Sequence, residues 1–161
     1  LLATPARPFE VMVGKILPYV ALGYVQLAVI MLAAWALFEV PMVGSFALLV
    51  PLIGVFMLAN LGVGFTFSTL ARNQLQAMQM TFFFFLPSML LSGFMFPFRG
   101  MPGWAQTLGE VLPLTHFLRI VRGIMLKGHD ALQVLPELWP LLAFLTVAGA
   151  VALKRYRQTL D

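Results

Sequence analysis

The chain has 161 residues, enough for one domain, and 61% of them are hydrophobic whereas 10% are charged. Soluble domains contain roughly 45–50% apolar and about 25% charged residues, so the composition excludes a soluble globular domain and predicts an integral membrane protein. The net charge of +4 does not indicate nucleic-acid binding, because the basic residues are scattered or lie at the ends of apolar runs, where membrane anchors occur.

The first 15 residues are of mixed polarity and contain Pro5 and Pro8, which suit the first turn of a helix. Apolar residues recur there at helical spacing, which predicts a short helix on the membrane surface, ended or bent at Pro18. Alternatively, these residues begin the first span. Because the chain starts with Leu1 and its first apolar run follows no signal-peptide pattern, we expect a fragment that lacks an N-terminal part.

Four apolar segments are long enough to cross a hydrocarbon core of roughly 30 Å. They cover residues 17–38, 46–70, 80–98 and 132–153. The second segment is rich in small and hydroxylated residues, which let helices approach closely, so we expect it to be buried among the others. Pro87 predicts a kink in the third segment.

Residues 99–130 are too many for a turn and too apolar for a free loop. The sequence predicts two helices there, over about 102–111 and 115–127, separated by a proline. At about 100° per residue, the second helix collects Arg119 and Arg122 on a polar face opposite an apolar one. The pair either covers the outer mouth of a pathway or anchors the bundle at the membrane surface.

Six of the ten Lys and Arg residues fall on one side of this four-span arrangement. Because basic residues are retained on the cytoplasmic side, we expect that side and the C-terminal tail to be cytoplasmic, with the three tryptophans near the outer interface. The six residues are Arg7, Lys15, Arg72, Lys154, Arg155 and Arg157.

No catalytic or metal-binding set is present in the sequence. The phosphate-binding pattern GxxxxGK[ST] is missing, because Lys15 is followed by Ile16, so another chain would have to hydrolyse any ATP. There is no cysteine, and His116 and His129 do not have a metal-ligand spacing. The carboxylates lie near or outside the span ends and are not paired by local spacing.

Polar residues inside the spans indicate where a pathway could run. Asn60 is expected to form an interhelical hydrogen bond or to contact a substrate, while Ser88 and Ser92 lie four residues apart on one helix face. Phe84 belongs to an aromatic block that serves either packing or a route for bulky apolar compounds. None of these residues is ionisable, which argues against a proton relay.

Several runs of the sequence resemble the permease subunits of bacterial ATP-binding-cassette exporters of the type-2 class. They are STLARNQLQAMQ (68–79), FFFFLPSMLLSGFMFPFRGMPGW (82–104), LPLTHFLRIVRGIMLKG (112–128) and the opening TPARPFEVMVGKILPY (4–19). The resemblance implies that residues 1–161 form one all-α transmembrane permease domain, a polytopic helical bundle that represents the last four of six spans in the bacterial inner membrane.

The resemblance also implies partners. Such permeases dimerise with a second copy or a paralogue and work with two cytoplasmic ATPase subunits, which would bind ATP and magnesium, so no cofactor is expected on this chain. The third span would help to line the route. The surface that couples to the ATPase would comprise Thr4, Pro5, Arg7, Pro8, Glu10, Gly14 and Lys15. The outer gate would comprise Pro97, Gly100, Pro102, Gly103, Trp104, Arg119 and Arg122.

The resulting hypothesis is the membrane subunit of an ATP-driven exporter that moves a hydrophobic or amphipathic substrate outward by alternating access. A non-transporting membrane scaffold is the first alternative. Half of a secondary transporter is the second, and the lack of a membrane-embedded charge weighs against it.

Overall fold

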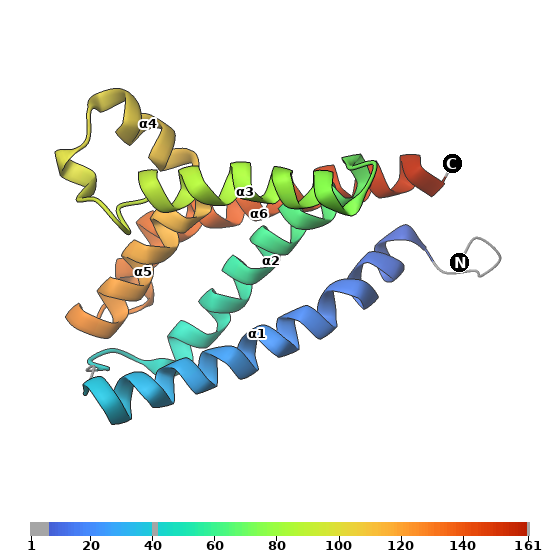
Figure 1. Ribbon diagram of the computed structural model, residues 1–161. Helices are drawn as coiled ribbons and strands as arrows, with labels where there is room; N and C mark the ends of the chain where they lie inside the picture. Colours follow the sequence, from blue (N-terminus) through green and yellow to red (C-terminus); the bar gives the residue numbers. More distant parts are fainter. Residues whose placement is uncertain (1–6, 40–41, 161) are drawn as a thin grey trace.

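The computed structural model describes residues 7–39 and 42–160, which form six α-helices, one short 3-10 helix and no strand (Figure 1). The all-α helical fold is therefore confirmed. The elements are α1 (Pro8–Phe38), α2 (Phe46–Leu70), α3 (Gln74–Leu91), η1 (Phe98–Gly100), α4 (Gly103–Val111), α5 (Pro113–Lys127) and α6 (Ala131–Leu160).

Three of the described helices are long and apolar enough to cross a membrane. They are α1 over Phe9–Phe38, α2 over Phe46–Leu70 and α6 over Ala131–Tyr156. The 18-residue helix α3 differs from the predicted third span at 80–98, because it starts at Gln74 and ends at Leu91. Its first turns are polar and contain three glutamines.

The bounds of α3 have local causes. The side chain of Asn73 accepts a hydrogen bond from the backbone N–H of Gln76 at 2.8 Å, which caps the helix start. The polar run after Asn73 therefore forms the first turns of α3. At the other end Gly93 has a φ of 91°, a left-handed conformation that a helix cannot continue through.

The first helix is continuous from Pro8 to Phe38, so the prediction of a separate surface helix that ends at Pro18 was wrong, whereas a bend at Pro18 stays a prediction. The alternative, in which these residues begin the first span, is the observed arrangement. The N–H of Arg7 donates to the carboxylate of Glu10 at 3.3 Å and satisfies a group at the helix start. Pro18 removes one backbone hydrogen bond, and neighbouring turns carry the helix past it.

The core lies where α2, α5 and α6 meet. Its buried residues are Leu49, Leu52 and Ile53 of α2, Ile120 and Ile124 of α5, and Val134 and Leu141 of α6. The rings of Phe56 and Phe117 stack with their centroids 4.0 Å apart. A Cβ on Gly62 would lie 3.5 Å from Ala148, so this glycine lets α2 approach α6 closely, as the small residues of α2 predicted.

The molecule has two ends. The described N-terminal and C-terminal residues lie at one end, together with the connection between α2 and α3 (Figure 1). The end of α1, η1, α4, α5 and the start of α6 lie at the other, which we call the helical-cap end. The three tryptophans belong to segments of the helical-cap end and are exposed, as expected for residues at one membrane interface: Trp35, Trp104 and Trp139.

Candidate functional site

An apolar cavity of about 500 Å³ lies between α1, α2, α3 and the start of α5. It brings together three residues that were predicted to line a pathway, Asn60, Phe84 and Ser88, whereas Ser92 is not among its lining residues. Its walls consist of Tyr19, Phe56, Met57, Asn60, Leu61, Val63, Gly64, Phe67, Thr81, Phe84, Phe85, Ser88 and Leu114.

Two polar side chains of this cavity, those of Asn60 and Ser88, bond to their own helices. The amide of Asn60 donates to the carbonyl of Phe56 at 3.0 Å, and the hydroxyl of Ser88 donates to the carbonyl of Phe84 at 2.8 Å. The hydrogen bond of Asn60 is thus intrahelical, and the interhelical bond expected from the sequence is not among those of the described residues. Because these donors are occupied, the cavity suits an apolar guest.

Ser92 follows the last residue of α3 and has a different environment. Its side chain is buried, and its hydroxyl oxygen has no hydrogen-bond partner among the described residues. The pathway role predicted for Ser92 remains a prediction.

A second cavity, of about 910 Å³, adjoins the first between α1, α2 and α6. The two share four lining residues: Tyr19, Asn60, Leu61 and Gly64. The second cavity extends toward the end that holds both termini, where Lys15, Ala71 and Tyr156 line it. The two cavities therefore follow the long direction of the bundle from Ala71 to Leu114.

The residues predicted to face an ATPase lie at the start of α1. Arg7 and Glu10 are exposed, and a Cβ placed on Gly14 would meet no atom within 4 Å. The ammonium of Lys15 lies 5.4 Å from the ring centroid of Tyr156, which links α1 to the end of α6. Pro8 is the first residue of α1. Two further residues of this set, Thr4 and Pro5, lie outside the described residues.

The residues predicted to form an outer gate all lie at the helical-cap end. Pro97 and Gly100 flank and end η1, while Pro102 and Gly103 start α4. The side chain of Gln106 donates to the carbonyl of Met101 at 2.9 Å and holds this connection against α4. The remaining three residues are Trp104 on α4, and Arg119 and Arg122 on α5.

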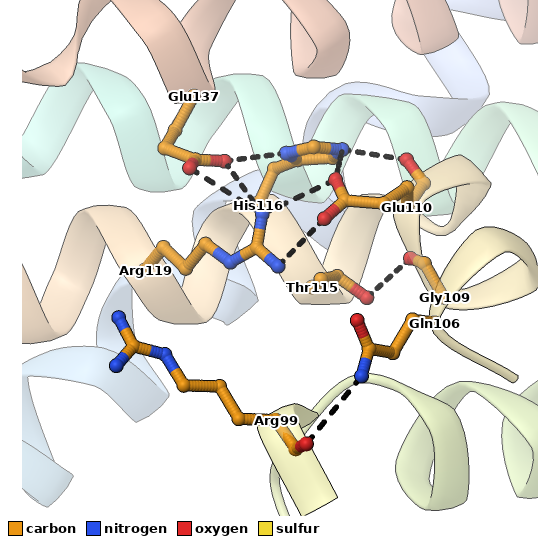
Figure 2. A network of polar contacts seen from close by, with 8 residues as sticks. All are labelled: Arg99, Gln106, Gly109, Glu110, Thr115, His116, Arg119 and Glu137. Carbon is orange, nitrogen blue, oxygen red and sulfur yellow. Dashed lines mark hydrogen bonds and ion pairs between the residues drawn. The ribbon is translucent and has the colours of Figure 1, made fainter. Parts of the chain in front are cut away.

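A polar cluster of Glu110, His116, Arg119 and Glu137 joins α4, α5 and α6 at this end (Figure 2). The buried ring of His116 contacts an oxygen of Glu137 at 2.6 Å through Nδ1, and the backbone carbonyl of Glu110 at 2.6 Å through Nε2. Arg119 donates to Glu110 at 2.8 and 3.2 Å and to Glu137 at 3.4 Å. We call these four residues the latch cluster.

The latch cluster shifts the pKa values of two of its members. Hydrogen bonds from Arg119 hold the pKa of Glu110 below its usual 4.5, although partial burial opposes them. The same bonds raise the pKa of Arg119 above its ordinary value. Both groups therefore carry full charge near neutral pH, and α4 is held to α5 by charge-assisted hydrogen bonds.

The latch cluster adds residues that the sequence did not single out. Arg119 forms ion pairs with two carboxylates, and its predicted role in an outer gate stays a prediction. Glu110 and His116 lie close in sequence to Arg119, and this proximity is only a weak indication that the three side chains interact. Glu137 lies 21 residues from His116, and no local spacing could have paired them.

Among the residues that the structure describes, no group of three His, Cys, Asp or Glu side chains could hold a metal ion. The described part of the site consists of two adjoining, mostly apolar cavities and a polar cluster that joins three helices at one end.

Comparisons with known proteins agree on one family. A family model described as "ABC-2 type transporter" matches residues 1–126. The chain is 32% identical over 159 residues to the "Probable multidrug ABC transporter permease YbhR" of Escherichia coli (strain K12), covering 98% of this chain and 43% of the relative.

Two further relatives are similar over nearly the whole chain. The "Inner membrane transport permease YhhJ" of Escherichia coli (strain K12) is 30% identical over 164 residues, covering 99% of this chain and 43% of the relative. The "Linearmycin resistance permease protein LnrN" of Bacillus subtilis (strain 168) is 25% identical over 157 residues, covering 98% of this chain and 40% of the relative. The chain thus spans less than half the length of these relatives, and no solved structure matches it.

Proposed function

Because the chain belongs to the ABC-2 type transporter family, we propose that it is the membrane-spanning part of a permease subunit in an ATP-driven exporter. The substrate is a hydrophobic or amphipathic compound that leaves the cytoplasm. The two adjoining cavities, one between α1, α2, α3 and α5 and the other between α1, α2 and α6, carry this proposal, because their combined course follows the bundle and their lining is mostly apolar. The printed name of the relative YbhR, which includes "multidrug", supports the same substrate class.

The mobile element in this proposal is α1. Within its most apolar window none of the residues is buried, whereas Tyr19 lines both cavities. The hydroxyl of Tyr24 donates to the carbonyl of Val50 at 2.7 Å and fastens the middle of α1 to α2. A push on residues 7–15 by an ATPase subunit would tilt α1 about this contact and change the width of both cavities.

The second element in this proposal is the helical-cap end, which is closed in this structure. There α4 and α5 cover the outer mouth of the route, and the latch cluster holds them to α6 in the closed state. Outward release requires the latch cluster to separate while α1 tilts. This gives alternating access, in which the two ends of the route open in turn.

In this proposal, the distribution of Lys and Arg residues sets the orientation of the chain in the membrane. The end with both termini carries Arg7, Lys15, Arg72, Lys154 and Arg155, and the positive-inside rule places it in the cytoplasm. The C-terminus is then cytoplasmic and the helical-cap end faces outward across the bacterial inner membrane. Partner ATPase subunits would supply the ATP and magnesium sites, and a second permease copy or a paralogue would complete the transporter.

The proposal is tested with the full-length protein that contains this sequence. Cells that lack it should accumulate a fluorescent hydrophobic cation or dye, and re-expression should restore efflux only when the genetically linked ATPase can hydrolyse ATP. Affinity purification of the permease should recover that ATPase. Equal dye accumulation with and without the protein across a panel of apolar compounds, together with no ATPase in the purified complex, would contradict the exporter.

A further inference from the structure

A third cavity, of about 490 Å³, lies at the helical-cap end between η1, α5 and the first turns of α6. It shares no lining residue with the two apolar cavities. Its walls consist of Phe98, Arg99, Arg119, Ile120, Arg122, Gly123, Lys127, His129, Gln133, Val134, Pro136 and Glu137. We call it the basic cavity.

The charges of the basic cavity are unbalanced. Four Arg and Lys residues line it against one carboxylate, that of Glu137, which already pairs with His116 and Arg119. Among the described residues of the helical-cap end, ion pairs join only the members of the latch cluster. Arg99, Arg122 and Lys127 therefore direct positive charge at this cavity without a carboxylate partner in the described part of the chain.

His129 is held at the wall of the basic cavity by two glycines. Gly128 has a φ of 69° and ends α5, and the N–H of His129 donates to the carbonyl of Gly123 at 3.0 Å. A Cβ on Gly123 would collide with the His129 ring, so glycine at this position lets the ring lie against α5. The imidazole ring of His129 thus has a fixed position beside the arginines of the basic cavity.

The chemistry of this lining fits a phosphate group on an amphipathic molecule. Guanidinium groups present forked donors that match phosphate oxygens. Phe98, Ile120, Val134 and Pro136 add apolar surface next to the charges. The exposed tryptophans of the same end are typical of the headgroup level of a membrane. We propose that the basic cavity binds the phosphate of an anionic amphiphile, through Arg99, Arg122 and Lys127.

This proposal does not rest on transport, and binding alone tests it. The full-length protein in neutral detergent is titrated with short-chain phosphatidylglycerol, short-chain phosphatidylcholine and inorganic phosphate, and tryptophan fluorescence or thermophoresis reports binding. We expect phosphatidylglycerol to bind about tenfold more tightly than phosphatidylcholine, a difference of about 1.4 kcal/mol. We expect inorganic phosphate to bind more weakly than phosphatidylglycerol.

A matched pair of double variants identifies the site. Arg122→Gln with Lys127→Gln removes one exposed arginine and one exposed lysine from the basic cavity, and Arg72→Gln with Lys154→Gln removes the same pair at the opposite end. The first variant should lose the preference for phosphatidylglycerol, and the second should keep it. Equal affinity of the wild type for both lipids, or equal loss in both variants, would overturn the proposal. Inorganic phosphate binding as tightly as phosphatidylglycerol would overturn the role of the apolar lining and identify free phosphate as the ligand.

Discussion

Nδ1 of His116 on α5 lies 2.6 Å from Oε2 of Glu137 on α6, although 21 residues separate them in sequence. The other ring nitrogen of His116 faces the carbonyl oxygen of Glu110 at 2.6 Å. Both ring nitrogens of His116 therefore face an oxygen atom. The buried side chain of His116 thus connects α4, α5 and α6.

Removing the charge of Glu137 should weaken the latch cluster. Glu137→Gln keeps the shape of the side chain and loses its charge-assisted hydrogen bonds to His116 and Arg119. Because such bonds contribute about 1–3 kcal/mol, we expect a clear fall in the melting temperature of the full-length protein in detergent. Glu39→Gln, the same change on an exposed residue near the helical-cap end, is the control and should leave the melting temperature unchanged. Equal melting temperatures for Glu137→Gln and wild type would contradict the latch.

Acid should release the contact between α4 and α5. The pKa of Glu110 lies below its usual 4.5 because of its hydrogen bonds with Arg119. A lowered folded-state pKa adds stability that is complete above the unfolded value and is lost as the pH falls through the folded value. The difference in thermal stability between wild type and Glu110→Gln should thus be constant near neutral pH and shrink as the pH falls below about 4.5. A difference that persists undiminished into stronger acid would show that Glu110 acts by another means.

Filling the apolar cavities should block the route. Gly64 lines both cavities, and a Cβ there would meet nothing within 4 Å, so Gly64→Leu projects into open space without a clash. We expect lower efflux and an affinity for substrate weaker by about tenfold, or about 1.4 kcal/mol. Gly149→Leu on α6 is the matched control, because its Cβ is equally free and it lines none of the cavities described above. Equal efflux by the two variants would exclude the cavities as the route.

Substitutions at the start of α1 should uncouple ATP hydrolysis from transport. Gly14 has open space around it, so Gly14→Leu should leave folding and assembly intact while changing the shape of the surface through which an ATPase subunit would push on α1. Glu10→Gln removes a charge while keeping an oxygen that can accept from the N–H of Arg7. For both variants we expect normal assembly with the ATPase, continued ATP hydrolysis and reduced efflux. Full efflux by both would remove these residues from the coupling surface.

The orientation can be tested by single-cysteine labelling, because these 161 residues contain no cysteine. Thr107→Cys places a thiol on an exposed position of α4, and Gln74→Cys places one at the exposed start of α3, near the opposite end. A membrane-impermeant maleimide should label the first in intact cells and the second only after permeabilisation. The reverse pattern would invert the topology.

The sequence by itself determined the class of the protein and most of its helices. Long apolar runs predict α1, α2 and α6, because only a membrane or a large core can accept them, and Pro113 together with the amphipathic pattern after it predicts α5. The bounds of α3 were less predictable, because they depend on the cap by Asn73 and on the turn at Gly93, whereas hydropathy alone predicted a segment over 80–98. The position of Pro18 predicted an end or a bend in the first helix, whereas the helix continues past this residue.

Only the tertiary structure decided which residues act together. Asn60 and Ser88 come from different helices and meet in one cavity because α3 packs beside α2. His116, Arg119 and Glu137 form one cluster because α5 packs against the start of α6. Helical periodicity relates residues three or four positions apart, whereas these contacts depend on how the chain turns at Gly128 and on the close packing of α5 with α6.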